Sequence, residues 1–251
     1  MYFVPTTPDR PFPEIIKDVK GGFGYDINVQ MYIPNWKLFN CSDRLNIAWL
    51  IVALIRLKTS PEVTIPVVAD RPFSDIPSSC KEAEILPVEE VSHRRLVPVK
   101  NRNLDLDETD LVWIREHWQQ SIKLMNNNRD FNTAVRAADF SLITSSSSLA
   151  LITLWGALER LFSPAKQELR FRISASIASF LEPSGSKRLS LYKKILKLYD
   201  ARSEAAHGTS KKHTDPLIET YELIRRVLIK MIEDGHVPNR DEIEKLMFGC
   251  E

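Results

Sequence analysis

Two side chains near the end of a long amphipathic segment are of types that could act on a phosphate ester. Arg202 and His207 both lie in the decapeptide YDARSEAAHG, which runs from Tyr199 to Gly208. Arginine is always charged and can bind a phosphate through two parallel hydrogen bonds, whereas histidine exchanges protons near neutral pH. Such a pair could hold a phosphodiester and exchange protons with its oxygens without a metal ion.

The segment that carries this pair is predicted to be a helix that begins near Ser186. Its apolar residues recur at i, i+3, i+4 and i+7: Tyr192, Ile195, Leu196 and Tyr199. At about 100° per residue, Arg202 lies roughly 20° from Ile195, and His207 lies roughly 20° from Leu196. We therefore expect Arg202 and His207 to border the apolar face of the helix, about 140° apart.

A preceding amphipathic segment is predicted to supply a carboxylate partner. Its apolar residues share one helix face: Ile152, Trp155, Leu158 and Phe162. Glu159 lies on the same face, where a carboxylate needs a partner, and Arg202 is the cation that we expect there. A structural interpretation stays open, in which a buried Glu159–Arg202 ion pair fixes the helix register and His207 interacts with the helix dipole.

Together, these two segments resemble the HEPN superfamily, and in particular its Apea-like branch. The resemblance rests on LWGALERLF, from Leu154 to Phe162, and on the ending Tyr-x-x-Arg-Ser-x-x-x-His-Gly, and it covers roughly residues 130–235. It implies a compact helical bundle that forms a homodimer and acts as a metal-independent endoribonuclease. Proteins of this family occur in toxin–antitoxin systems, in antiviral defence and in RNA processing.

The resemblance implies catalytic roles for Arg202 and His207 and, more loosely, supporting roles for Glu159 and Ser203. Glu159 would orient Arg202, and Ser203 would contribute a hydroxyl hydrogen bond. Asp200 is a weaker supporting candidate. Proton transfer to and from two ribose oxygens requires two groups, and a twofold dimer would place two Arg202/His207 pairs across one cleft.

Basic residues are concentrated around the motif. Between residues 163 and 212 there are eleven lysines and arginines against four acidic residues, although the whole chain has a net charge of only +1. A positive surface attracts an RNA backbone, and four residues are candidates for binding it: Arg170, Arg172, Lys211 and Lys212. A solvated helix surface rich in lysine is an equally good interpretation of the charge alone.

The composition, with 43% apolar and 27% charged residues, is that of an ordinary soluble globular protein. The longest apolar run, Ile47 to Ile55, is too short to span a membrane, and early prolines interrupt any secretory leader, so we expect a cytoplasmic protein. Three widely spaced cysteines are expected to be free thiols. The histidines lack metal-ligand spacing, so neither a metal nor a cofactor is predicted.

The predicted fold class is mainly α, with two regions. Residues 1–105 are expected to form a small, proline-rich α+β module, with a helix over residues 44–57 and short strands within residues 26–34, 63–69, 82–89 and 94–99. Residues 106–251 are expected to form a helical region that contains the HEPN-like bundle. Within it, the spacing of Leu111, Ile114, Trp118 and Ile122 predicts a helix with Trp118 in the core.

A second function class competes with the nuclease. The chain could be a non-catalytic helical module that binds RNA, a nucleotide or a protein partner, with the Arg–His pair retained for structure. An enzyme requires Arg202 and His207 to be accessible in a basic cleft, whereas burial of both favours the module. The sequence identifies neither an RNA target nor an antitoxin or regulatory protein.

Overall fold

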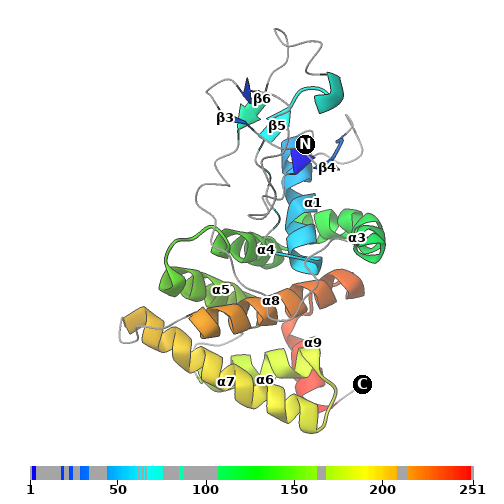
Figure 1. Ribbon diagram of the computed structural model, residues 1–251. Coiled ribbons are helices and arrows are strands. Elements are labelled where there is room, and N and C mark those ends of the chain that lie inside the picture. Colours follow the sequence, from blue (N-terminus) through cyan, green and yellow to red (C-terminus); the bar gives the residue numbers. More distant parts are fainter. Residues whose placement is uncertain are drawn as a thin grey trace.

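The computed structural model describes residues 2–3, 18–19, 23–24, 29–33, 44–61, 63, 65, 67–75, 85–87, 107–162, 168–207 and 214–249 (Figure 1). The described chain is mainly helical, which confirms the prediction of a mainly-α protein. Its α-helices are α1 (Arg44–Lys58), α3 (Glu108–Asn127), α4 (Arg129–Ser141), α5 (Ser147–Phe162), α6 (Leu169–Leu181), α7 (Ser186–His207), α8 (Thr214–Asp234) and α9 (Arg240–Phe248). A 3₁₀ helix, η1, spans Phe73–Asp75.

Short strands occur in the N-terminal part of the chain. They are β1 (Tyr2–Phe3), β2 (Asp18–Val19), β3 (Phe23–Gly24), β4 (Val29–Gln30), β5 (Val67–Ala69) and β6 (Ile85–Pro87). Four of them form an antiparallel sheet in the order β4-β1-β5-β6, and β2 pairs with β3. β4, β5 and β6 lie within three of the predicted strand segments, and the fourth, residues 94–99, lies outside the described residues.

Helix α5 lies at the centre of the helical core and contacts α4, α6, α7 and α8 (Figure 1). A helix that is surrounded in this way must be apolar on most of its circumference. Leu151, Leu154, Trp155 and Leu158 are accordingly all fully buried. Burial of each such side chain stabilises the fold by about 1.5–3 kcal/mol relative to an exposed position.

The orientation of α3 differs from the prediction. Trp113 is buried, whereas Trp118 is only half-buried and Leu111, expected in the core stripe, is exposed. The indole Nε1 of Trp113 donates a hydrogen bond to Glu233 Oε1 of α8 at 2.9 Å, and its ring stacks on His117 at 4.7 Å. Packing against α1 and α8 therefore selects the Trp113 face of this helix.

Short polar side chains cap the first turns of two helices. Asp107 accepts a hydrogen bond from the backbone N–H of Asp110 at 2.9 Å and thereby caps α3. The hydroxyl of Thr109 and this N–H together hold the pKa of the Asp107 carboxyl below its usual value. Ser146 accepts a hydrogen bond from Leu149 N at 3.3 Å at the start of α5.

Helix α1 belongs to the same core, because two buried arginines join it to the later helices. The Arg56 side chain is only 2% exposed, and its Nη1 lies 2.6 Å from Asp139 Oδ1 of α4. Its Nε donates to the carbonyl of Val63 at 2.9 Å. The contacts of α1 with α3, α4 and α8 thus extend the helical core across the boundary expected near residue 105.

The second buried arginine satisfies the C-terminal end of α1. Arg225 of α8 donates hydrogen bonds to the backbone carbonyls of Leu57 and Lys58, and its Nη1 lies 3.2 Å from Glu222. The last carbonyls of a helix have no partner within the helix, so a guanidinium is well suited to this position. Tyr221 lies beside this cluster, and complete burial raises the pKa of its hydroxyl.

The C-terminal helix α9 begins with a capping box. Asn239 accepts a hydrogen bond from Glu242 N at 3.1 Å, and Glu242 Oε2 accepts one from Asn239 N at 2.7 Å. The same carboxylate oxygen lies 2.8 Å from His236 Nε2. Ile243 is buried, and Met247 packs on Ser176 of α6, so the helix caps one end of the bundle.

Replacing Asp139 with asparagine removes the carboxylate that lies 2.6 Å from the buried Arg56 guanidinium. We expect the free energy of unfolding to fall by about 3 kcal/mol, because removing one partner of a buried ion pair is strongly destabilising. Urea unfolding measures this loss. The matched change Asp130→Asn removes the exposed ion pair with Arg160 and should cost less than about 1 kcal/mol. Equal losses in both variants would contradict the role given to Arg56.

Acid should release the cap of α9. The hydrogen bond with His236, followed by the one from Asn239, holds the pKa of the Glu242 carboxyl below its ordinary value of 4.5. A lowered folded-state pKa contributes stability that is fully present above the unfolded-state value and is lost as pH falls through the folded-state value. This contribution to α9 is therefore complete above pH 4.5 and disappears below it.

Hydrogen-exchange protection of the α9 amides tests this expectation. Glu242→Gln should lower the protection factors at neutral pH, and its difference from the wild type should shrink as the pH falls and the wild-type carboxyl becomes protonated. Glu244→Gln changes an acid of the same helix that pairs only with Arg240 at 2.9 Å, and it should retain the protection. A difference between Glu242→Gln and the wild type that persists unchanged in acid would refute the cap.

Candidate functional site

The predicted Arg–His helix forms as α7, which packs against α5, α6 and α8 (Figure 1). Its buried residues are Ile195, Leu198, Tyr199 and Ala205. Arg202 and His207 lie in its last two turns, and Gly208, the last residue of the decapeptide, lies outside the described residues. The arrangement of α5 and α7 places Arg202 beside Glu159, although the two are far apart in the sequence.

Glu159 and Arg202 form the predicted ion pair between α5 and α7. Arg202 Nη2 lies 3.3 Å from Glu159 Oε1, with the side chains 27% and 20% exposed, respectively. Tyr199 donates its hydroxyl hydrogen bond to the same oxygen at 3.2 Å. The Arg202 guanidinium also lies 5.6 Å from the Tyr199 ring centroid, so three side chains position one another.

Tyr199 has a role that its place in the apolar stripe did not reveal. Burial raises the pKa of its hydroxyl, and the negative charge of Glu159 raises it further. The phenol therefore stays protonated at neutral pH and donates to the carboxylate. A tyrosine, rather than leucine, one turn before Arg202 is the only local sign of this contact in the sequence.

Two nitrogen donors near this ion pair have no hydrogen-bond partner within the described part of the chain. They are Nε of Arg202 and Nε1 of Trp155, and both are buried. The Trp155 ring packs edge-on against Tyr199 at 5.0 Å, which connects it to the same cluster. Buried donors of this kind usually have partners, so this cluster retains hydrogen-bonding capacity.

His207 is exposed at the last position of α7, about 140° around the helix from Arg202. Arg202 contacts α5, whereas His207 lies on a side of α7 open to solvent. The divergence agrees with the expected angle of about 140° between these positions. Ser203 donates its hydroxyl to the carbonyl of Tyr199 at 3.4 Å, so in the single chain this hydroxyl serves its own helix.

Two of the other predicted residues bind each other. Arg170 of α6 makes a bidentate contact with Asp200 of α7, with both N–O distances 2.6 Å. This hydrogen bonding raises the pKa of the Arg170 guanidinium, and it occupies both the supporting acid and one RNA-binding candidate. Arg172 is half-buried, with its Nε unpaired in the described chain, and Lys211 and Lys212 lie outside the described residues.

The described ranges contain no group of three or more His, Cys, Asp or Glu side chains placed to hold a metal ion. No helix among these residues combines the length and apolar character needed to cross a membrane.

The arrangement of Glu159, Arg202 and Tyr199 can fix a guanidinium at the edge of the bundle. Such a guanidinium can bind a phosphate or stabilise a helix pair.

Comparison of the chain with known protein families, with curated proteins and with solved structures found no match.

A double-mutant cycle of Glu159→Gln and Arg202→Met measures how strongly the pair couples α5 to α7. Because both side chains are mostly buried and both contact Tyr199, Glu159 at its hydroxyl and Arg202 at its ring, we expect a coupling energy of about 1 kcal/mol in urea unfolding. The exposed pair Lys194–Glu219, which joins α7 to α8 at 3.1 Å, is the control and should show a smaller coupling. A Glu159–Arg202 coupling no larger than the control would contradict a positioning role for Glu159.

Proposed function

We propose that this protein is a metal-independent endoribonuclease with a helical bundle of HEPN type. The observation that carries the proposal is the Arg202 guanidinium, which is 27% exposed and is held by Glu159 and Tyr199 at the edge of the bundle. It lies five residues before an exposed His207 on the same helix. The residue types agree with the sequence resemblance. The surrounding α6–α7 region is also rich in lysine and arginine.

The chemistry requires one phosphate-binding group and two proton-exchanging groups. Arg202 binds the scissile phosphate and stabilises the charge that develops on it. The ribose 2′-oxygen attacks phosphorus while the bond to the 5′-oxygen breaks, which yields a 2′,3′-cyclic phosphate and a 5′-hydroxyl. One histidine accepts the proton of the 2′-hydroxyl, and a second donates a proton to the leaving 5′-oxygen.

A second copy of the chain supplies the second histidine in this proposal. His207 faces away from Arg202 in one copy, so a complete site needs another chain. Leu189 lies about five helical turns before His207 and therefore faces the same side of α7. Leu189 and Phe171 are 54% and 51% exposed, and Phe171 packs edge-on to Tyr192 at 6.1 Å. Burial of this apolar surface would stabilise a homodimer.

The biological setting follows from the same resemblance. We place the activity in the cytoplasm, in a toxin-like or antiviral-defence role in which RNA cleavage inhibits growth. An antitoxin or other regulatory protein would restrain it, and its identity is open. The role of the N-terminal strands is open in this proposal.

A non-catalytic role is the second candidate, and one observation favours it. The Glu159–Arg202 contact joins α5 to α7 and places part of the guanidinium in a structural ion pair. In this alternative, the basic α6–α7 region binds RNA, a nucleotide or a protein partner without cleaving it. Arg202 then maintains the helix packing, and His207 makes no contribution to chemistry.

Incubation of the purified protein with total RNA in EDTA separates the two functions. We expect chelator-resistant cleavage with 2′,3′-cyclic phosphate ends. His207→Ala and Arg202→Gln should each lose at least a hundredfold of the rate, because general acid–base and phosphate-binding groups contribute about 10²–10⁴ each. Mixing the two inactive variants should not restore the wild-type rate, because a mixed dimer retains only one of the two His207 side chains that the reaction requires.

His236→Ala is the matched control, since His236 is an exposed histidine between α8 and α9. It should cleave as the wild type does. Circular dichroism and urea unfolding show whether each variant remains folded. RNA retention without cleavage by the wild type would support the binding module, and cleavage that survives His207→Ala would refute the proposed catalytic pair.

A further inference from the structure

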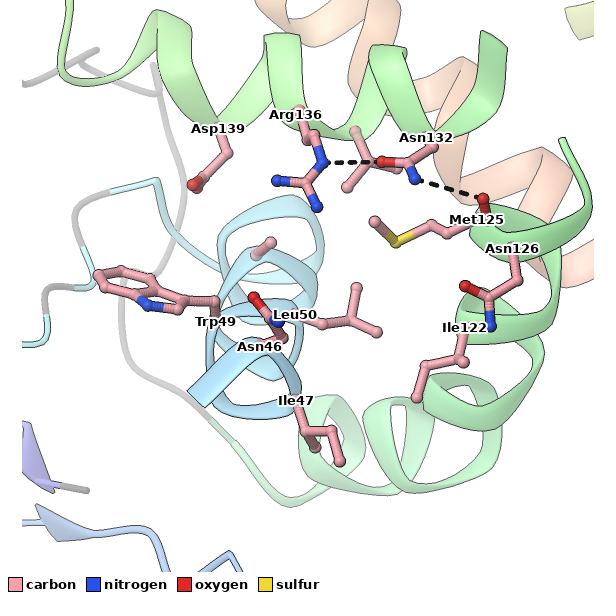
Figure 2. A pocket seen from close by; sticks show the side chains of 12 residues that line it. Asn46, Ile47, Trp49, Leu50, Ile122, Met125, Asn126, Asn132, Arg136 and Asp139 are labelled. Carbon is pink, nitrogen blue, oxygen red and sulfur yellow. Dashed lines mark hydrogen bonds between the residues drawn. The ribbon is translucent and has the colours of Figure 1, made fainter. Parts of the chain in front are cut away.

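A cavity of about 440 Å³ lies between α1, α3 and α4 (Figure 2). This volume falls within the range of small-molecule sites in proteins. Figure 1 shows α1 and α3 at the opposite end of the bundle from α6 and α7, so the cavity is separate from the Arg202 region. Ligand binding in this cavity would be independent of the proposed nuclease function.

The floor of the cavity is apolar. Ile47 and Leu50 of α1 face Ile122 and Met125 of α3 across it (Figure 2). Ile47, Leu50 and Ile122 are buried and Met125 is half-buried, so a ligand here would replace water against hydrocarbon. The apolar body of a small molecule fits this floor better than a sugar or another strongly hydrated group.

One guanidinium extends over this floor from α4. Arg136 Nε donates to Asn132 Oδ1 at 2.8 Å, and Asn132 Nδ2 donates to the carbonyl of Met125 at 3.3 Å. These two hydrogen bonds connect α4 to α3 and hold the guanidinium in place. Figure 2 shows the terminal nitrogens of Arg136 directed from α4 toward α1, into the cavity.

The positive charge of Arg136 is not neutralised within the described chain. No carboxylate of the described residues lies within ion-pair distance of its guanidinium. The other charged side chain of the cavity, Asp139, lies 2.6 Å from the buried Arg56 and is thereby compensated. The lining therefore has one uncompensated positive charge, with the Asn132 amide bonded to it and the Asn126 amide elsewhere in the lining, on α3 (Figure 2).

We propose that this cavity binds a small organic carboxylate with an apolar body. The carboxylate would pair with the two terminal nitrogens of Arg136, whose planar fork matches its geometry, and the body would cover the Ile47, Leu50 and Ile122 surface. A neutral molecule of the same shape gains the apolar contacts but leaves the guanidinium uncompensated. Charge and shape together define this ligand class.

Titration calorimetry with 4-phenylbutyrate and decanoate, each compared with its neutral amide, tests the proposal. Both acids should bind, and each amide should bind roughly tenfold more weakly, which corresponds to one charge-assisted hydrogen bond. Arg136→Gln should weaken binding of the acids by roughly tenfold and leave the amides unchanged. Arg136→Lys retains the charge without the planar fork and should give an intermediate affinity.

Two further measurements locate the ligand. Arg129→Gln removes an exposed arginine of α4 that does not line the cavity, and it should bind the acids as the wild type does. In methionine-methyl NMR spectra, the acids should shift the signal of Met125 and leave that of Met247, on α9, in place. Absence of binding by both acids, equal binding by Arg136→Gln, or shifts confined to Met247 would each overturn the proposal.

Discussion

The burial of α5 is the constraint on which the rest of the helical core depends. Four helices surround it, and its apolar circumference, including Leu154 and Trp155, determines where they can pack. A single acidic side chain on this helix, Glu159, must then be compensated near the edge of the core. Arg202 and Tyr199 of α7 provide that compensation, so the burial of α5 also fixes the direction of the candidate catalytic arginine.

Buried arginines extend this core to the N-terminal helix. Arg56 and Arg225 satisfy backbone carbonyls around the end of α1, and Asp139 compensates the charge of Arg56. Polar contacts of this kind restrict α1 to one position against α4 and α8 more strictly than apolar packing alone. That position leaves an open space between α1, α3 and α4. Asp139 pairs with Arg56 and anchors α1, so it does not balance the charge of Arg136.

The two arginines that carry the functional proposals differ in their surroundings. Arg202 has an acidic partner and an aromatic ring beside it, which fixes its geometry but reduces its net attraction for an anion. Arg136 is held by the amide of Asn132, which fixes its geometry and leaves its charge intact. Arg202, whose charge is partly balanced by Glu159, is suited to binding a phosphate transiently. Arg136, whose charge is not balanced, is suited to a ligand that carries a negative charge of its own.

The sequence predicts α1, α3, α5 and α7, because apolar periodicity depends on a few neighbouring positions. It also predicts the Glu159–Arg202 pair, because each of these charged residues lies in or beside an apolar stripe, where it needs a partner. It did not determine which face of α3 is buried, since Trp113 and Trp118 both fit a helical stripe and only contact with α1 and α8 selects Trp113. The Arg56–Asp139 contact joins residues 83 positions apart and has no local signature. The Arg170–Asp200 pair, the exposure of His207 and the Arg136 cavity likewise exist only once several helices pack together, because each depends on distances between elements that periodicity within one element does not contain.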